Sequence, residues 1–462
     1  MAAVCLIVYR YYWLRGAVDE GFTHDDLMNL YRAVTNSWGE LVRDLFTIWR
    51  PSALVRPMGE LAYRVLWLRF GFSPWPYHFV CLTLGAANML LAFAIGRAVL
   101  KNVWLALAIG WFLAYHGEMS GAYSNVGTIF DLLASFFYLL ALWIAVGNTK
   151  KEIRLALLVA VTLAALDSKE MAVSLPLAIA GVLKGRTSQR TRIWNFITVA
   201  MLALMAGVYV LGRVLGHGGV AEVPSYQPSI SIAQFAGNFA TLLSTLCYDL
   251  IHWTPAAALA FFLVPLAVFL IARLWFASFA WMMFVVSFLP LAFIPTRGLD
   301  AASLPLFWML LGLAAGLKPL TERNHAVRVF APVLLMIAIT VWHARIGAAP
   351  YPQFGAESND IRIAYDGISK SLAALPPDAH VAIIEDEFNP TFEWATLFMA
   401  RLATGHDWTL YRPADLKQLS PSERIDAALK VTPDGVLTCT EPNGAPPNLE
   451  QIRSGEFTCT AR

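Results

Sequence analysis

The sequence predicts an α-helical polytopic membrane protein with a small α/β domain at its C-terminus. Apolar residues make up 58% of the 462 positions and charged residues only 14%. In a typical soluble domain, apolar residues make up about 45–50% of the positions and charged residues about 25%. The apolar residues form long blocks within the first 345 positions, and such blocks suit lipid because a helix satisfies its own backbone hydrogen bonds there. We therefore divide the chain into a membrane domain, 1–346, and a soluble α/β domain, 347–462.

About 20 apolar residues span the hydrocarbon core of a bilayer as a helix. We expect about eleven spans, near 2–14, 76–97, 103–115, 126–147, 153–166, 170–183, 193–213, 255–272, 276–295, 302–317 and 329–346. The first is short and contains Arg10, and whether Met1 is the true start is left open. A cleaved signal peptide is the alternative, but neither a basic segment nor a small-residue cleavage site accompanies it.

Basic residues predict the orientation, because loops rich in Lys and Arg stay in the cytoplasm. Alternate loops hold nearly all of them: Arg97, Lys101, Lys150, Lys151, Arg154, Lys184, Arg186, Arg190, Arg192, Arg273, Lys318, Arg323 and Arg328. This places the N-terminus in the cytoplasm and both 15–75 and the C-terminal domain outside it, in an inner or plasma membrane of the bacterial type. A net charge of +2 gives no reason to expect a nucleic-acid partner.

The long first outward segment, 15–75, contains two apolar stripes at helical spacing. We expect surface helices that either lie along the membrane or pack on neighbouring spans. In the soluble domain we expect helices at 361–375 and 391–402 and strands at 380–384 and 436–440. Cys439 and Cys459 are able to pair if this domain is extracytoplasmic, but the sequence does not give their distance.

Ionisable residues gather at the span ends on the outward side, where burial is costly unless they pair or act. They are Asp25, Asp26, Arg56, His78, His116, Glu118, Asp131, Asp167, Lys169, Glu170, Arg297 and Asp300. Two adjacent carboxylates at a helix start also serve as ordinary caps. The alternation of acids and cations on one face nevertheless favours a site for a negatively charged lipid headgroup.

The order of these residues resembles a known family. Asp25-Asp26 lies in a long first loop, followed by Arg56-Pro57 with Tyr63, and by Pro76-Tyr77-His78 leading into a span with Asn88; His116, Asp131 and Ser168-Lys169-Glu170 come next. Over about residues 20–320 the chain is similar to the GT-C glycosyltransferases, particularly the polyprenyl- or dolichyl-phosphate-mannose protein O-mannosyltransferases that carry tetratricopeptide repeats. No such repeat is found here.

The resemblance implies an inverting transfer of a hexose or pentose from a polyprenyl-phosphate-linked donor to a hydroxyl acceptor, on a protein, glycan or lipid, at the extracytoplasmic face. It gives the role of general base on the acceptor hydroxyl to Asp25 or Asp26. It places Arg56, His78, His116, Glu118, Lys169 and Arg297 at the donor phosphate. No cofactor is certain, and a divalent metal on Asp25, Asp26 and Glu118 stays open because no spacing demands it.

The chain also departs from the family pattern. Where His-Pro-x-x-x-Glu is usual it has His116-Gly117-Glu118, with Gly121 at the Glu position, and the later Arg-x-x-Tyr pattern ends on Asp300. These departures leave open another sugar or acceptor. A membrane transporter or lipid flippase is the alternative, together with a non-catalytic divergent member. No internal repeat supports transport.

Overall fold

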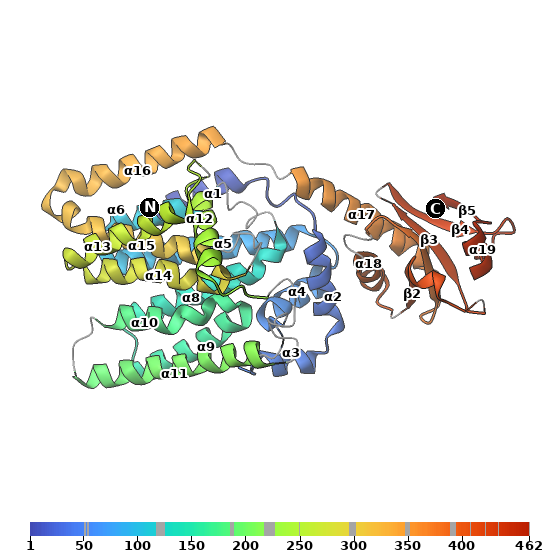
Figure 1. The fold of residues 1–462 in the computed structure, drawn as a ribbon, viewed down its shortest axis with the longest axis horizontal. Helices are drawn as coiled ribbons and strands as arrows, with labels where there is room; N and C mark the ends of the chain where they lie inside the picture. The colour runs from blue at the N-terminus through green and yellow to red at the C-terminus, as the bar shows by residue number, and fades with distance from the viewer. Residues whose placement is uncertain are drawn as a thin grey trace.

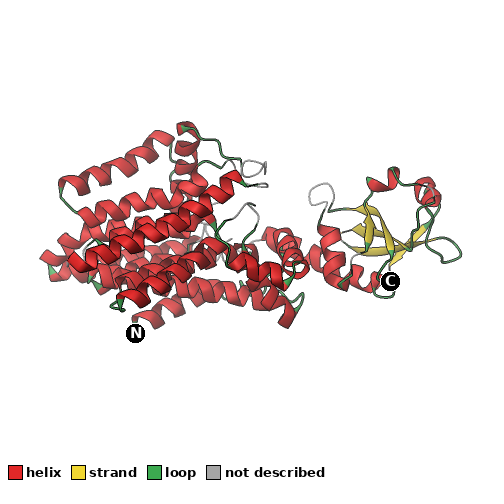
Figure 2. Ribbon diagram, turned by 90° about the horizontal axis from the view of Figure 1, so that it is seen from below, coloured by secondary structure: helices red, strands yellow, loops and turns green. Residues whose placement is uncertain are grey.

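The computed structural model describes residues 1–49, 52, 55–116, 125–184, 189–216, 227–248, 250–294, 302–346, 352–388, 394–406, 408–420, 422–432 and 434–461. The molecule is elongated, with a helical bundle at one end and a small domain with a β-sheet at the other (Figure 1). The N-terminus lies in the half of the bundle that is farther from the sheet domain in both ribbon views (Figures 1 and 2).

Each apolar segment expected to span the membrane forms a helix in the bundle. These helices are α1 (Ala2–Leu14), α5 (Trp75–Leu100), α6 (Val103–Ala114), η2 (Val126–Thr128) continuing into α8 (Ile129–Val146), α9 (Lys151–Ser168), η3 (Glu170–Ser174) continuing into α10 (Leu175–Leu183), α11 (Gln189–Leu215), α13 (Pro255–Ile271), α14 (Trp275–Ala292), α15 (Ser303–Arg323) and α16 (His325–Ile346). A further helix, α12 (Ile232–Leu246), lies between α11 and α13 in the sequence.

Among the described residues, six helices are long and apolar enough to cross a membrane: Trp75–Leu100, Val126–Val146, Arg192–Leu215, Trp275–Ala292, Ser303–Glu322 and Ala326–Arg345. Four more apolar helices are shorter, at Ala2–Leu14, Val103–Ala114, Glu170–Leu183 and Pro255–Ile271. The chain therefore has the helices of an integral membrane protein. The expected number of eleven spans remains a prediction, because short helices cross a bilayer only where it is thin or where neighbours cover their ends.

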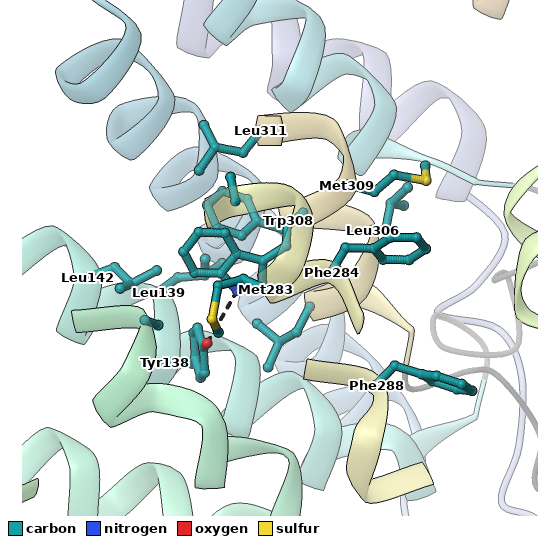
Figure 3. Packing of buried hydrophobic residues seen from close by; sticks show 14 of the residues in the cluster. Tyr138, Leu139, Leu142, Met283, Phe284, Phe288, Leu306, Trp308, Met309 and Leu311 are labelled. Carbon is teal, nitrogen blue, oxygen red and sulfur yellow. Dashed lines mark hydrogen bonds between the residues drawn. The ribbon is translucent and has the colours of Figure 1, made fainter. Parts of the chain in front are cut away.

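Aromatic and aliphatic side chains fill the centre of the bundle between α8, α14 and α15 (Figure 3). Trp308 and Phe284 are fully buried there, and the Trp308 indole nitrogen donates to the Tyr138 hydroxyl at 3.2 Å. A polar ring atom is tolerated in such a core only when it has a partner. This packing fixes α8, whose first turns carry site residues.

The segment 15–75, which the sequence predicts to face outward and which we call the first outward segment, forms three helices in its described residues at the end of the bundle that faces the sheet domain (Figure 1): α2 (His24–Thr35), α3 (Trp38–Leu45) and α4 (Pro57–Phe70). α2 begins with a capping box in which Thr23 and Asp26 bond each other's backbone, and α3 begins with another, from Ser37 and Glu40. Such boxes satisfy amide groups at the helix start that have no partner within the helix. Both apolar stripes are thus helical, whereas the position of these helices at the membrane surface remains a prediction.

The C-terminal domain is a five-stranded sheet with helices on both faces. Its elements are α17 (Pro352–Leu372), β1 (His380–Asp386), α18 (Ala395–Thr404), β2 (Thr409–Tyr411), η5 (Asp415–Lys417), β3 (Ala427–Thr432), β4 (Gly435–Thr440), α19 (Leu449–Ser454) and β5 (Thr458–Ala461). The strand order is β2-β1-β3-β4-β5, with β1 parallel to β2 and β3, and β4 antiparallel to β3 and β5. A disulfide joins Cys439 and Cys459 across β4 and β5.

The C-terminal domain packs directly on α2. One continuous apolar cluster contains Leu27 and Leu30 of α2 together with Ile361 of α17 and Met399 of α18. Tyr31 stacks on Phe398 with ring centroids 4.2 Å apart, and Phe72 stacks on Tyr365 at 3.7 Å. The apolar face of α2 is thus covered by the C-terminal domain and α4, and the domain and the first outward segment share one core.

Candidate functional site

The two adjacent aspartates at the start of α2 have different surroundings. Asp26 is 0% exposed. Its Oδ2 accepts from the Thr23 amide at 2.8 Å and from the Thr23 hydroxyl at 3.0 Å, and its Oδ1 accepts from the Tyr63 hydroxyl at 2.7 Å. Burial raises the pKa of Asp26 to about 6, against the lowering effect of these hydrogen bonds. Asp26 therefore ties α2 to α4 and has no oxygen facing solvent for a substrate.

Asp25 is exposed, and no hydrogen bond or ion pair involves its carboxylate in the described part of the chain. Its Cβ lies 3.7 Å from the position that a Cβ on Gly127 would occupy. Asp25 thus lies against η2, directly before α8. A side chain at Gly127 would contact the Asp25 side chain at its Cβ, so the glycine leaves room for Asp25 at this point.

One turn further along α8, Asp131 forms an ion pair with Lys169, which lies at the end of α9. Gly127 and Asp131 are four residues apart, so the pair lies about 6–8 Å along the helix from the position of Asp25. Both side chains are 12% exposed, and the second carboxylate oxygen, Asp131 Oδ1, is buried without a hydrogen-bond partner in the described structure. A buried acceptor without a donor is costly and marks a place where a ligand or water fits.

A second ion pair lies next to the first. The Arg56 guanidinium is 3.3 Å and 3.4 Å from the two carboxylate oxygens of Glu170, and it lies 5.7 Å from the ring centre of Phe130. Phe130 precedes Asp131, and Glu170 follows Lys169. The structure therefore brings Arg56, Lys169, Asp131 and Glu170 together as one group, which we call the charge cluster.

Arg213 of α11 was not selected as a site residue from the sequence. It is 6% exposed, and its guanidinium donates to the carbonyl oxygens of Ser52 and Val55 and to the Tyr209 hydroxyl. These bonds hold the segment that leads to Arg56. The signal in the sequence was a lone cation at the end of an apolar helix, which is also typical of a residue that reaches the membrane surface.

An apolar groove opens beside the charge cluster, between η3, α10, α11 and α14. It has a volume of about 460 Å³, and its polar end is formed by Glu170, Tyr209 and Arg213. Leu177, Val210, Val214, Val286 and Leu289 line the remainder. A groove with charged groups at one end and aliphatic walls at the other matches a lipid with a polar head.

The two predicted site histidines, His78 and His116, form their hydrogen bonds in the described structure with backbone carbonyl groups and not with the charge cluster. His78 Nε2 is 3.2 Å from the carbonyl oxygen of Gly21, and His116 Nε2 is 3.2 Å from that of Leu246. His116 also stacks on Tyr248, with ring centroids 4.0 Å apart. Burial lowers the pKa of His116 to about 4, so its ring is neutral near pH 7. Neither histidine contacts the charge cluster through a hydrogen bond in the described structure, and their predicted role at a phosphate stays a prediction.

Two predicted site residues, Glu118 and Arg297, lie outside the described residues. Within the described ranges no group of three or more His, Cys, Asp or Glu is arranged to hold a metal ion. Asp25 and Asp26 do not converge on one point, because Asp26 faces Tyr63 whereas Asp25 faces η2. These two residues therefore do not form a chelating pair.

At one end of the bundle the structure thus has a free carboxylate, Asp25, followed in space by the cations Lys169 and Arg56 and then by the apolar groove. A carboxylate is able to take a proton from a hydroxyl, and the two cations are able to balance the charge of a phosphate. The arrangement is suited to group transfer from a phosphorylated lipid.

Comparison with known proteins gives one informative similarity. No protein-family model matches the chain. Over 145 residues it is 30% identical to the protein O-mannosyl-transferase Tmtc2 of Drosophila melanogaster, a match that covers 29% of this chain but only 16% of the fly protein. In part of its length, this helical membrane protein is thus similar to a glycosyltransferase of the kind that the motif order resembles.

Proposed function

We propose that this protein is a membrane glycosyltransferase that moves a sugar from a polyprenyl-phosphate-linked donor to a hydroxyl acceptor on the extracytoplasmic face. The observation that carries the proposal is the exposed Asp25 carboxylate about one helical turn from the charge cluster, which itself borders an apolar groove. The similarity to an O-mannosyl-transferase supports the same reaction class.

In this reaction Asp25 takes the proton of the acceptor hydroxyl while the hydroxyl oxygen forms a bond to the anomeric carbon of the sugar. The bond from that carbon to the phosphate oxygen breaks, and the electron pair leaves with the lipid phosphate. Attack from the side opposite the leaving group inverts the anomeric centre. Lys169 and Arg56 balance the negative charge that develops on the phosphate, at a site largely shielded from water where such charges interact strongly.

The prenyl tail occupies the groove between α10, α11 and α14 in this proposal. The groove has aliphatic walls, and its charged end lies at Glu170, next to Lys169. Asp131 and Glu170 hold the two cations in place and keep the unoccupied site close to neutral. Two cations without partners at a membrane boundary would be costly.

Two features support the extracytoplasmic face. Nearly all the basic loops lie on the opposite side in the predicted layout. The Cys439–Cys459 disulfide belongs to the domain that covers α2, and disulfides persist in oxidising compartments.

The test is the Asp25→Asn variant, reconstituted in vesicles with radiolabelled polyprenyl-phosphate hexoses, mannose first, and a mixture of hydroxyl acceptors. We expect normal folding and a 10²- to 10⁴-fold loss of transfer, roughly the contribution of a positioned general base. Asp434→Asn, which removes an exposed carboxylate from the β3–β4 turn, is the matched control and should transfer normally. Full activity in Asp25→Asn would remove the proposed base.

A further inference from the structure

A second cleft lies where the first outward segment meets the C-terminal domain, and the proposed reaction does not use it. It has a volume of about 350 Å³. Its walls come from the segment Asp19–Phe22, from the turn at Phe72 and Pro74 that precedes α5, and from the face of α17 between Gly355 and Arg362. A cleft of this size is in the range of sites for small ligands or short chain segments.

One wall of the cleft carries a buried polar group without a partner. Ser358 is 8% exposed, and its hydroxyl oxygen has no hydrogen-bond partner in the described structure. A buried hydroxyl without a partner costs free energy unless a ligand or water satisfies it. Gly21 allows this close approach, because a Cβ there would lie 2.5 Å from the Cβ of Ser358.

The charge of the cleft is negative. Asp19 is exposed and Glu20 is half-buried, and in the described structure neither carboxylate forms an ion pair or a side-chain hydrogen bond. The opposing cation, Arg362, donates to the side-chain oxygen of Asn359 at 2.9 Å. Two carboxylates therefore face one guanidinium, which repels anionic lipid or glycan and attracts a positively charged ligand.

The cleft is also close to the proposed base. Phe22 lines it and precedes Asp25 by three residues, so the two Cα atoms lie at most about 11 Å apart even if the chain is fully extended. The same side of α17 is fixed to the start of α2, because Glu357 Oε1 accepts from the His24 amide at 2.8 Å and lies 2.6 Å from His24 Nδ1. A chain bound in the cleft is thus held within a few residues' length of Asp25.

We propose that this cleft binds the acceptor, and that the acceptor is an extended peptide with positively charged residues near its hydroxyl residue. The role of the bound peptide as the sugar acceptor rests on the proposed function, whereas the preference of the cleft for a cationic peptide does not. Asp19 and Glu20 contact the basic side chains, Ser358 and Asn359 bond the peptide backbone, and the hydroxyl residue extends toward Asp25.

Binding is measured first, without donor, by fluorescence anisotropy of the full chain with three labelled nonapeptides. Each peptide has one Thr, flanked by Lys, Ala or Glu. We expect the Lys peptide to bind about tenfold more tightly than the Ala peptide, as two partly exposed ion pairs would give. The Asp19→Asn/Glu20→Gln double variant should remove this preference, and the exposed pair Asp434→Asn/Glu450→Gln should retain it.

A second variant blocks the space without removing charge. Gly355 lines the cleft, and a Cβ there would meet no atom within 4 Å, so a side chain can start at this position and Gly355→Phe is chosen to fill the cleft. It should weaken all peptide binding at least tenfold. Gly237→Phe, at another open helical glycine on α12, is the control and should have no effect.

Equal affinity for the three peptides, unchanged binding in Gly355→Phe, or binding of a neutral oligosaccharide in place of the peptides would overturn the inference. Transfer is then measured separately with the donor. If the Lys peptide binds with the expected preference but no sugar is moved to it or to any other acceptor, the proposed function fails and the cleft remains a peptide site. If sugar is moved without any dependence on peptide charge or on Asp19 and Glu20, the cleft inference fails and the proposed function stands.

Discussion

The ion pairs at the end of the bundle that faces the C-terminal domain are largely buried, whereas those of that domain are more exposed. Lys169 and Asp131 are each 12% exposed, but Arg424 is 53% exposed in its ion pair with Asp426. An exposed pair contributes about 0–1 kcal/mol, and a buried one often no more than apolar side chains would. Stability alone therefore does not explain the charge cluster. A role in binding or catalysis does explain why these charges are buried there.

The largest effect should come from breaking the buried pair in the bundle. Lys169→Met leaves the Asp131 carboxylate partly buried without its cation, and we expect a loss on the order of 3 kcal/mol in the free energy of unfolding. The double variant Lys169→Met/Asp131→Asn should recover most of that stability but none of the transfer activity. Thermal unfolding in detergent and the transfer assay measure the two effects. Restored activity in the double variant would show that the cluster is only structural.

The matching change in the C-terminal domain removes its covalent link. The disulfide Cys439–Cys459 closes a segment with a sequence separation of 20. Replacing both residues with Ser should cost about 3 kcal/mol of stability, the value expected for a loop of this length. The loss should appear as faster proteolysis of β4 and β5 with no change in donor binding. A change in donor binding would mean that the strands β4 and β5 influence the site in the bundle.

Asp26 ties α2, the helix that the C-terminal domain covers, to α4, and its effect on stability depends on pH. Because burial raises the pKa of Asp26 to about 6 in the folded protein, from 3.8 otherwise, the folded state binds the proton more tightly. Stability from this group is present below about pH 4, falls as the pH rises to about 6 and is then constant. The total change is on the order of 2–3 kcal/mol. Melting temperatures from pH 4 to pH 7 measure it, and Asp26→Asn should remove this part of the pH dependence.

The smallest effect is expected at the contact between His24 and Glu357, which joins the two regions. Glu357→Gln keeps an acceptor for the His24 amide but removes the charge, so we expect about 1 kcal/mol of lost stability. Hydrogen exchange at the first turn of α2 should increase, and transfer should fall a few-fold because Asp25 lies on that turn. Glu450→Gln, at an exposed position of α19, is the control. Unchanged exchange in α2 would indicate that the shared apolar core alone holds the helix.

The sequence predicted the bundle helices well because an apolar run in lipid has few alternatives to a helix. The sheet was predicted only in part. β1 and β4 were expected, whereas β3, with two alanines and Lys430, and the short strands β2 and β5 were not. β3 begins with residues of weak strand propensity, and β2 and β5 are only three and four residues long, so pairing with neighbouring strands decides their structure.

The candidate site shows the same division. The order of charged residues along the chain determined that the ends of several helices carry acids and cations, and it selected Asp25, Asp26, Arg56 and Lys169. It did not distinguish Asp25 from Asp26, because adjacent residues on a helix differ by about 100° in direction and only the packing of Tyr63 and η2 shows which one is buried. It also missed Arg213, Glu357 and the covering of α2 by the soluble domain.

Local sequence thus determined which segments are helical and how many charges they carry, since hydrophobicity and helix capping act over a few residues. Only the tertiary structure decided which carboxylate is free, which cations are paired and which surfaces meet. Those properties depend on residues far apart in the sequence, from Asp26 with Tyr63, 37 positions apart, to His24 with Glu357, 333 positions apart. Their burial and partners exist only once the chain has folded.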